Sequence, residues 1–390
     1  MRPAERRLGL DEGLADFRYL WHPQPFREIR PAWCNELPAL ADELMALPDE
    51  AVAHLNNDGI AALEWLARHV PEVDGIRRLA ELPAGAASPL PDHGAHWAWE
   101  IPGRKREQIE AFAAAAVPSG GRVFDWCGGK GHLGRLLALN WQVPATSLDI
   151  DATLCAEGRE LARRAKVEHD FLVADALAAG GKLEAGHHLV ALHACGDLHR
   201  TAVQSAAERG VAALDVAPCC YFKGVEDYYQ PLSAGAALKL SRDDIRLAVT
   251  ETVTASPRQA RRRDLEMAWK LGFDALRRAV TGGADYKTFK PVPSAWFSCN
   301  FGEFLRAMAE REELVLPPNF NPDEFEATGW QRQWEVMRLS IVRHAFRRAI
   351  EVWLALDLAV LLEQSGYEVR LGTFCPRHLT PRNLLLSARR

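Results

Sequence analysis

The feature that most constrains the fold is an alternation of short apolar runs with amphipathic stretches after residue 120. The apolar runs, each predicted to be a strand, are 121–126, 144–150, 167–175, 187–194 and 211–218. Apolar residues at helical spacing occupy three of the intervening stretches, namely 131–141, 154–166 and 198–210. Strands that alternate with helices predict a parallel sheet with crossover helices. We therefore expect an α/β fold with a doubly wound sheet.

The regions on either side of this alternation have other patterns. Residues 1–100 have helical spacing and few candidate catalytic groups, so we expect an N-terminal helical accessory domain there and a second domain over 101–390. From about 221 to 335 the pattern is irregular, which predicts an insertion after the fifth strand. A long helix over 331–366, with room for one break, and a hairpin would then close the chain.

The turn after the first predicted strand is rich in glycine, and two ligands suit such a turn. Gly129, Gly131 and Gly134 satisfy the G-x-G-x-x-G pattern of dinucleotide-binding proteins, but S-adenosylmethionine is held by a similar turn. Asp149, at the end of the second predicted strand, would bind ribose hydroxyls in either case. Asp125 favours S-adenosylmethionine, because a carboxylate before the turn repels a pyrophosphate and attracts a sulfonium or an ammonium group.

A third acid and one departure complete the prediction of a cofactor site. Asp175 follows the third predicted strand, where it could meet the amino group of adenine. Cys127 stands where the usual turn for S-adenosylmethionine has glycine; a Cβ is tolerable there if its φ is not positive and the neighbouring Gly128 takes the strain. Cys127 also favours an alternative, a catalytically silent protein that binds S-adenosylmethionine as a scaffold. A nicotinamide-dependent oxidoreductase is the less favoured alternative.

Polar and sulfur-bearing side chains follow the fourth and fifth predicted strands, and the carboxyl ends of such strands are where ligands bind. These residues are His193, Cys195, Asp197, Cys219, Cys220 and Tyr221. One interpretation is a structural turn with buried thiols. A second is the wall of a substrate pocket, formed by the three cysteines and the tyrosine, in which Asp197 or His193 takes a proton; His193 would also contact the cofactor.

A third interpretation of the same ends is a zinc site. Its ligands would be His193, Cys195, Cys219 and Cys220. The spacing lacks a C-x₂-C pair, and adjacent cysteines rarely bind one ion together, so no metal site is predicted and a metal cofactor stays uncertain.

Three segments carry a resemblance to a known family. DWCGGKGHLG, LHACGDL and PCCY, in this order, resemble the methyltransferase-like protein twenty-five family, which is related to the methyltransferase domain of the eukaryotic tRNA 2′-O-methyltransferase that acts on the acceptor stem. The likeness continues in the C-terminal helix, with Arg343, Glu351 and Asp357, and in the closing segment TPRN. It covers about 100–240 and 335–390.

This resemblance implies a Rossmann-like class I methyltransferase sheet with Gly129, Gly131, Asp149 and Asp175 around S-adenosylmethionine. A methyl-acceptor substrate is then the expected partner. We expect RNA, of a tRNA-like kind, to be favoured over protein or a small molecule.

Charge and cysteine content bear on partners and compartment. The formal net charge is −5, so there is no general attraction to nucleic acid, although four arginines lie close together at 258 and 261–263. These could hold RNA phosphates or form a solvated helix face. The eight cysteines come with no apolar leader and no apolar run long enough for a bilayer, which predicts reduced thiols in a cytoplasmic protein without membrane contact.

Overall fold

A computed structural model describes residues 1–94, 96–250, 256–283 and 285–390. By its internal contacts the chain divides into two units. Unit 1 comprises Met1–Asp16, Gly75–Thr254 and Arg347–Arg390, and unit 2 comprises Phe17–Asp74 and Ala255–Phe346. The first hundred residues are thus shared between the two units, and neither unit begins or ends at residue 100, where a domain boundary was expected. The role of those helices as an accessory domain stays a prediction.

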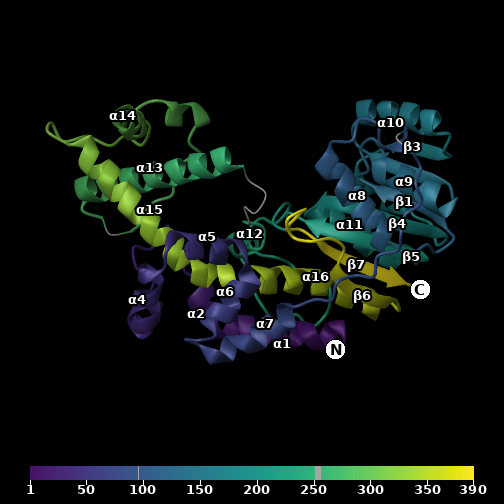
Figure 1. Cartoon of the computed structure of the whole chain (residues 1–390), viewed down its shortest axis with the longest axis horizontal. Helices are drawn as coiled ribbons and strands as arrows, with labels where there is room; N and C mark the ends of the chain where they lie inside the picture. The colour runs from purple at the N-terminus through teal and green to yellow at the C-terminus, as the bar shows by residue number, and fades with distance from the viewer. Residues whose placement is uncertain (95, 251–255, 284) are drawn as a thin grey trace. The chain divides into compact units, whose positions relative to one another are not determined.

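Unit 1 is built on a seven-stranded sheet with the order β3-β2-β1-β4-β5-β7-β6 (Figure 1). The strands are β1 (Arg122–Trp126), β2 (Ala145–Asp149), β3 (His169–Val173), β4 (His187–Cys195), β5 (Ala213–Cys219), β6 (Glu368–Thr373) and β7 (Leu384–Arg389). The pairings among β1 to β5 are parallel, and β7 is antiparallel to both β5 and β6. The predicted parallel sheet, the insertion after the fifth strand and the closing hairpin are confirmed.

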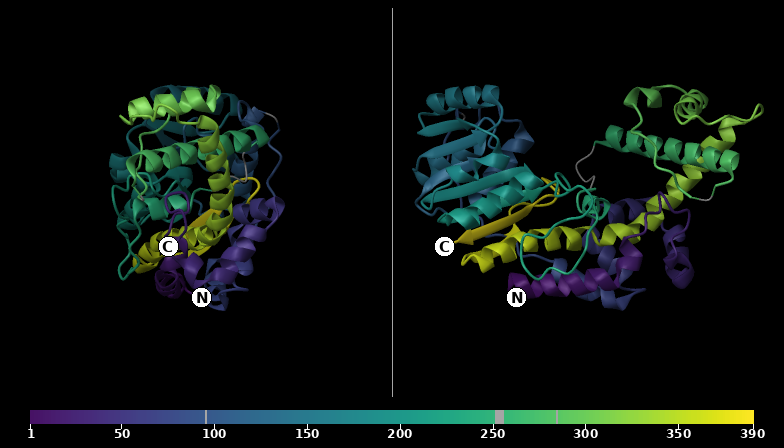
Figure 2. Two further views of the ribbon diagram at one scale, coloured as in Figure 1. Left: turned by 90° about the vertical axis from the view of Figure 1, so that its left-hand side faces the viewer. Right: turned by 180° about the vertical axis from the view of Figure 1, so that it is seen from behind.

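Helices cover both faces of this sheet. The helices of unit 1 are α1 (Pro3–Asp16), η2 (His96–Ala98), α8 (Gly103–Ala115), α9 (His132–Trp141), α10 (Ala152–Ala165), η3 (Ala176–Lys182), α11 (Asp197–Arg209), α12 (Arg242–Leu247) and α16 (Arg347–Gln364). A short helix, α7 (Asp74–Ala80), begins at the boundary between the units. In both views of Figure 2, α16 runs alongside β6, with which it is in contact.

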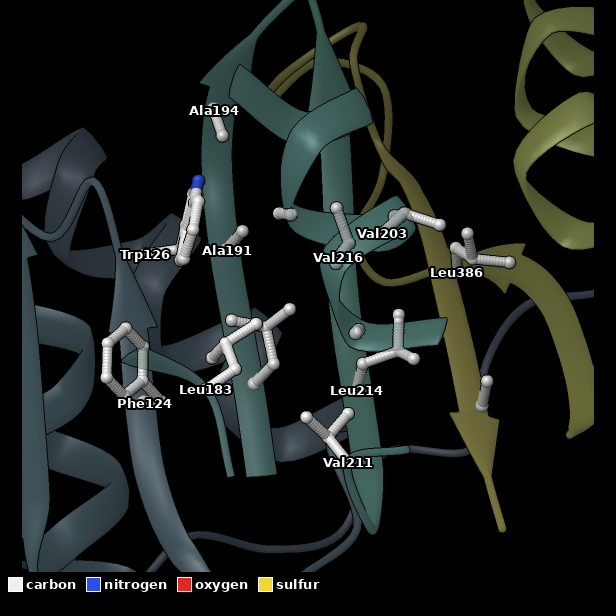
Figure 3. Packing of buried hydrophobic residues seen from close by; sticks show 14 of the residues in the cluster. Phe124, Trp126, Leu183, Ala191, Ala194, Val203, Val211, Leu214, Val216 and Leu386 are labelled. Carbon is white, nitrogen blue, oxygen red and sulfur yellow. The ribbon is translucent and has the colours of Figure 1, made fainter. Parts of the chain in front are cut away.

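The strand residues alternate between two apolar cores, as expected for a sheet buried on both faces. Phe124 and Leu189 belong to the core beneath η3, α11 and α16, together with Leu214 and Leu386 (Figure 3). The neighbouring Val190, like Val123, belongs instead to the core beneath α8 and α9. Continuous apolar runs in the strands are the consequence of this two-sided burial.

Unit 2 is helical and centres on one long helix. Its helices are α2 (Arg18–Trp21), α3 (Trp33–Glu36), α4 (Pro38–Ala46), α5 (Asp49–Asn57), α6 (Gly59–Leu66), η1 (Pro71–Val73), α13 (Pro257–Thr281), η4 (Ser294–Ser298), α14 (Phe301–Arg311) and α15 (Pro322–Ala345). α15 contacts α13, α14 and the N-terminal helices α2, α4, α5 and α6. The break expected in the long C-terminal helix lies at Phe346, between α15 and α16. No helix in the described residues has both the length and the hydrophobicity to span a bilayer.

The segment after β5 is tied to α16 by one buried carboxylate. Asp357 is fully buried and accepts four hydrogen bonds: from the Tyr229 hydroxyl, from the backbone N–H of Leu232, and from both the N–H and the hydroxyl of Ser233, at 2.6–2.9 Å. Because a buried carboxylate is costly unless its oxygens are satisfied, these bonds fix residues 229–233 on the helix. Asp357, which the family resemblance singled out, therefore has a structural role.

We predict that Asp357→Asn lowers the free energy of unfolding by about 3 kcal/mol, because the new amide NH₂ would face groups that are themselves donors. Urea denaturation followed by circular dichroism measures this loss. Glu368→Gln is the matched control, since the Glu368 side chain is exposed and pairs with Arg370 at the surface. An equal loss in the two variants would contradict the structural role of Asp357.

Candidate active site

The glycine turn between β1 and α9 is built around the Asp125 side chain. Its carboxylate is 2% exposed, and Oδ2 accepts hydrogen bonds from the Gly134 N–H at 3.1 Å and the Ser147 hydroxyl at 2.9 Å. A Cβ on Gly128 would lie 2.4 Å from the same oxygen, so the turn can approach the acid only with glycine there. Burial raises the pKa of Asp125 to about 6, against the effect of the two hydrogen bonds.

A histidine extends this arrangement to β3. Nε2 of His169 lies 2.8 Å from the Ser147 hydroxyl oxygen. Because that hydroxyl donates to Asp125, its oxygen accepts from Nε2–H of His169, which fixes the tautomer. Burial lowers the pKa of His169 to about 3, so the ring is neutral at pH 7. Asp125 thus holds three strands and the turn together, and its attraction to a sulfonium group stays a prediction.

Cys127 departs from the conformation expected for it. Its φ is +57°, in the left-handed region, and the residues of the turn that share this region are Gly129 and Gly131, not Gly128. The condition under which a Cβ would be tolerable there is therefore not met, and a residue with a side chain is held in a conformation that favours glycine. Strain of this kind persists only where the surroundings fix it, and it is common at functional sites.

The structure brings the three predicted acids together around Cys127. Burial raises the pKa of its thiol to about 12, and Asp149, Asp125 and Asp175 contribute in the same direction, as does Cys195. Asp149 Oδ2 accepts the Gly129 N–H at 2.9 Å, at the end of β2. Asp175 is exposed and its Oδ1 accepts the Leu177 N–H at 2.9 Å, which caps η3. The carboxyl ends of β1, β2 and β3 therefore share one site.

The turns after β4 and β5 interlock. β4 has an irregularity between Leu192 and Cys195, after which Cys195 pairs with Cys219. The Gly196 N–H donates to the Cys219 carbonyl at 3.1 Å, and the Asp197 N–H donates to the Lys223 carbonyl at 3.1 Å. Gly196 has a φ of +56°, and a Cβ on it would lie 2.0 Å from the Lys223 oxygen. This contact sets the cysteines of the two strands opposite each other.

The predicted cysteine group is assembled without His193. The Sγ atoms of Cys195, Cys219 and Cys220 lie within 4.8 Å of one another, and the Cys195–Cys219 separation is 3.4 Å. A hydrogen bond from Cys219 lowers the pKa of Cys220, while its bond with Cys195 raises the pKa of Cys219. His193 instead has Nε2 at 3.0 Å from Oε1 of Gln108.

His193 lies near the cysteines in the chain but has its own environment. Gln108 donates through its amide nitrogen to the Leu379 carbonyl, so its oxygen faces His193 and accepts from Nε2–H. Burial, helped by the positive charges of Arg382 and Lys105, lowers the pKa of His193 to about 4, so the ring is neutral at pH 7. A base with so low a pKa takes protons weakly. Its φ of +63° is again left-handed.

Asp197 and Tyr221 lie in different surroundings. Asp197 has a side chain 45% exposed, 3.5 Å from Arg200. It lines a cavity of about 440 Å³ formed with residues 224–228, Arg200 and Gln230, and none of the residues predicted to bind the cofactor is among those lining it. Tyr221 is 1% exposed and packs edge-on against His199. Its hydroxyl has no hydrogen-bond partner among the described residues. Burial places this tyrosine in the interior of the unit.

A comparison with protein families identifies part of this unit. Residues 104–225, less than a third of the chain, match the family model described as a methyltransferase domain. This segment is the one that supplies β1 to β5 and the glycine turn. Residues 104–225 are a methyltransferase domain. The glycine turn and the three predicted acids all lie within this segment.

Comparisons with other proteins add the following similarities. No curated protein matches the chain. Among solved structures, the chain is similar to a protein from work on the conversion of a disulfide bond into a thioacetal group during echinomycin biosynthesis (25% identity, 25% of this chain and 43% of that one, TM-score 0.22). It is also similar to TYW2 of M. jannaschii in complex with AdoMet, with 13% identity over 30% of this chain and 52% of that one and a TM-score of 0.26. The chain thus spans about half the length of these two proteins.

A third similarity covers more of the chain. An O-methyltransferase family protein from Burkholderia thailandensis shares 11% identity over 85% of this chain and 71% of that one, with a TM-score of 0.32. The assignment of the methyltransferase domain rests on the family match, the strand order and the site.

Sequence reasoning missed the polar side chains that position this site. Ser147 and His169 hold Asp125, and Gln108 orients His193. Ser147 and His169 are polar residues within the short apolar runs that form β2 and β3, and this is the signal that could have found them. Gln108 lies on α8 among exposed charged residues, and no pattern distinguishes it.

We predict that the neutral, buried His169 makes the methyltransferase domain sensitive to acid. Its pKa lies below that of an unfolded chain, so the unfolded state binds more protons and stability is lost as the pH falls below about 6.5. Between pH 7 and pH 5 this residue should cost about 2 kcal/mol. His169→Gln, which can still donate to Ser147, should therefore lose about 2 kcal/mol less over this range.

Urea denaturation at the two pH values measures the difference. His54→Gln is the control, because His54 is exposed on α5 and its replacement should leave the pH dependence unchanged. If His169→Gln and the unsubstituted protein lose equal stability, the assignment of a neutral His169 is wrong.

Proposed function

We propose that the whole chain is an S-adenosylmethionine-dependent methyltransferase of the methyltransferase-like protein twenty-five family, acting in the cytoplasm on RNA. The observation that carries the methyltransferase activity is the set of acids at the ends of β1, β2 and β3 around the glycine turn. The order of motifs through LHACGDL and PCCY supports the family. In this proposal residues 1–100 and 221–335 are an accessory domain and an insertion that help to present the acceptor.

The cofactor would be held by the turn and by two of the acids. Asp149, whose Oδ2 accepts the Gly129 N–H at 2.9 Å beside the turn, would bind the ribose hydroxyls. Asp175, exposed at the end of β3, would accept from the adenine amino group. Gly131 and Cys127 would line the approach to the turn. S-adenosylmethionine supplies an electrophilic methyl group, which a nucleophilic oxygen, nitrogen or sulfur takes by in-line displacement.

The chain's own groups would position the acceptor and take its proton. Positioning should provide much of the rate acceleration, and a base is needed only where the nucleophile is protonated. Asp197 and His193 are the candidates for that base. A pKa of about 4 makes His193 no stronger a base than an ordinary carboxylate, so this value does not decide between the two candidates. Cys195, Cys219 and Cys220 would line the acceptor side.

A cluster of exposed arginines supports RNA as the acceptor. Arg258, Arg261 and Arg263 are exposed in the first two turns of α13, whereas Arg262 is occupied by Glu266 and by backbone carbonyls. Exposed guanidinium groups can bind phosphates without first breaking ion pairs within the protein. A catalytically silent scaffold is the second candidate, favoured by the strained Cys127 in the turn; it predicts binding of S-adenosylmethionine without methyl transfer.

We predict that Asp149→Ala abolishes binding of S-adenosylmethionine in calorimetry, because it removes both the ribose acceptor and the support of the Gly129 N–H. Asp149→Asn should bind at least about tenfold more weakly, the effect of losing about 1.4 kcal/mol. Asp151→Ala is the control, since this acid lies two residues on and its side chain caps α10. Unchanged affinity in Asp149→Ala would refute the ribose contact.

We predict that the purified chain transfers the tritiated methyl group of S-adenosylmethionine to RNA in a fractionated lysate from cells that lack this protein. Replacing Arg258, Arg261 and Arg263 by Gln should reduce labelling at least about tenfold, with a weaker salt dependence, because phosphate contacts are lost. The affinity for S-adenosylmethionine should not change. The matched control replaces three exposed arginines of the methyltransferase domain, Arg163, Arg164 and Arg209, by Gln.

The fraction that takes up the label decides between the candidates. Label that ribonuclease removes supports RNA as the acceptor. Label in protein or in small molecules contradicts RNA but keeps the enzyme. No label in any fraction, with cofactor binding intact, supports the scaffold.

A further inference from the structure

We propose that Cys195, Cys219 and Cys220 bind one zinc ion at the carboxyl ends of β4 and β5, with a fourth coordination position left open. This inference goes beyond the proposed function, which needs no metal. It rests on the placement of three thiols by two separate strands.

The separations of the thiols suit a single ion. A tetrahedral zinc site with Zn–S bonds of about 2.3 Å has its sulfur atoms about 3.8 Å apart. The Cys195 and Cys219 sulfur atoms are 3.4 Å apart, and all three lie within 4.8 Å of one another. The separations in the structure are thus close to those that one zinc ion requires.

The backbone explains how two adjacent cysteines can share an ion. Successive side chains of a strand point to opposite faces, which normally separates neighbours. Cys219 is the last residue of β5, and Cys220 has a φ of +44°, so the alternation ends between them. The irregularity in β4 then places Cys195 opposite Cys219. The objection that adjacent cysteines rarely bind one ion together does not apply to this conformation.

The chemistry of the group selects a thiophilic metal. Three thiolates suit zinc and do not suit magnesium or calcium, which prefer oxygen. Three thiolates with Zn²⁺ carry a net charge of −1, and Lys223 and Arg382 lie within electrostatic range of Cys220 to offset it. Cys195 and Cys220 are partly exposed, which gives an ion access, while Cys219 is buried.

The fourth position would lie beside the cofactor site. Cys195 is within electrostatic range of Cys127 in the glycine turn. Zinc sites with three protein ligands usually keep the fourth position for water or substrate. The ion lowers the pKa of a water molecule or other protonated group that binds there. The ion would thus hold water, or an atom of the acceptor, next to the methyl donor.

Metal analysis of the full chain tests the proposal. The purified, reduced protein should contain about one zinc ion per chain, and the triple variant with Ser at 195, 219 and 220 should contain none. Cys299→Ser is the control, because this partly buried cysteine lies in unit 2, and it should keep the zinc. If the triple variant does not fold, Cys220→Ser alone, at a partly exposed position, should lower zinc affinity at least about tenfold.

A second measurement separates metal binding from oxidation and from the proposed function. Cobalt added to the metal-free chain should give thiolate-to-cobalt charge-transfer absorption, which Cys220→Ser weakens. Binding of S-adenosylmethionine, measured on the same samples, tests the proposed function separately. The proposal is overturned if the unsubstituted chain takes up no zinc, if the triple variant takes up as much, or if Cys195 and Cys219 are found as a disulfide in the reduced, zinc-supplied protein.

Discussion

The site depends on one buried carboxylate. Asp125 is packed beneath the glycine turn, where an ionised group is costly unless hydrogen bonds satisfy it. Ser147 and the Gly134 N–H supply them, and His169 holds Ser147 in turn, so β1, β2, β3 and the start of α9 are fixed relative to one another. Glycine is required at 128 because a side chain there would collide with this acid. Hydrogen bonds among Asp125, Ser147 and His169, on three adjacent strands, thus fix the inner side of the turn. The proposed cofactor would bind on its outer side.

The order of elements was predictable because the sheet is buried on both faces. Two-sided burial makes each parallel strand a short apolar run, such as 187–194, and these runs stand out between amphipathic helices. The division into units was not predictable, since it depends on pairs distant in the chain. Trp353 on α16 donates to Asp11 on α1 at 2.7 Å, and Leu238 donates to the same carboxylate. The sequence around residue 11 gives no indication of hydrogen-bond partners that lie more than two hundred residues away.

The candidate site was predictable in its acids and not in its supports. Asp149 and Asp175 follow strands, and the ends of parallel strands meet at one edge, so their position could be inferred from the sequence alone. Ser147 and His169 support the turn from positions inside β2 and β3. A polar residue inside an apolar strand is normally treated as an exception to the pattern, so it does not point to such a role. The conformation of Cys127 could not be inferred either, because a positive φ on a residue with a Cβ is set by packing around it and not by its own preference.

The left-handed residues link the two halves of the site. Cys127 and Cys220 directly follow β1 and β5, and His193 lies two residues before the end of β4; each has a positive φ despite its side chain. Such a conformation costs roughly 1–2 kcal/mol per residue, so three at one sheet edge must be held by other contacts. Cys127 is held within the glycine turn. The turns that contain His193 and Cys220 are joined by the backbone hydrogen bonds from Gly196 to Cys219 and from Asp197 to Lys223. A strand that continued regularly would alternate its side chains between the two faces of the sheet, so each positive φ interrupts that alternation near the carboxyl end of its strand.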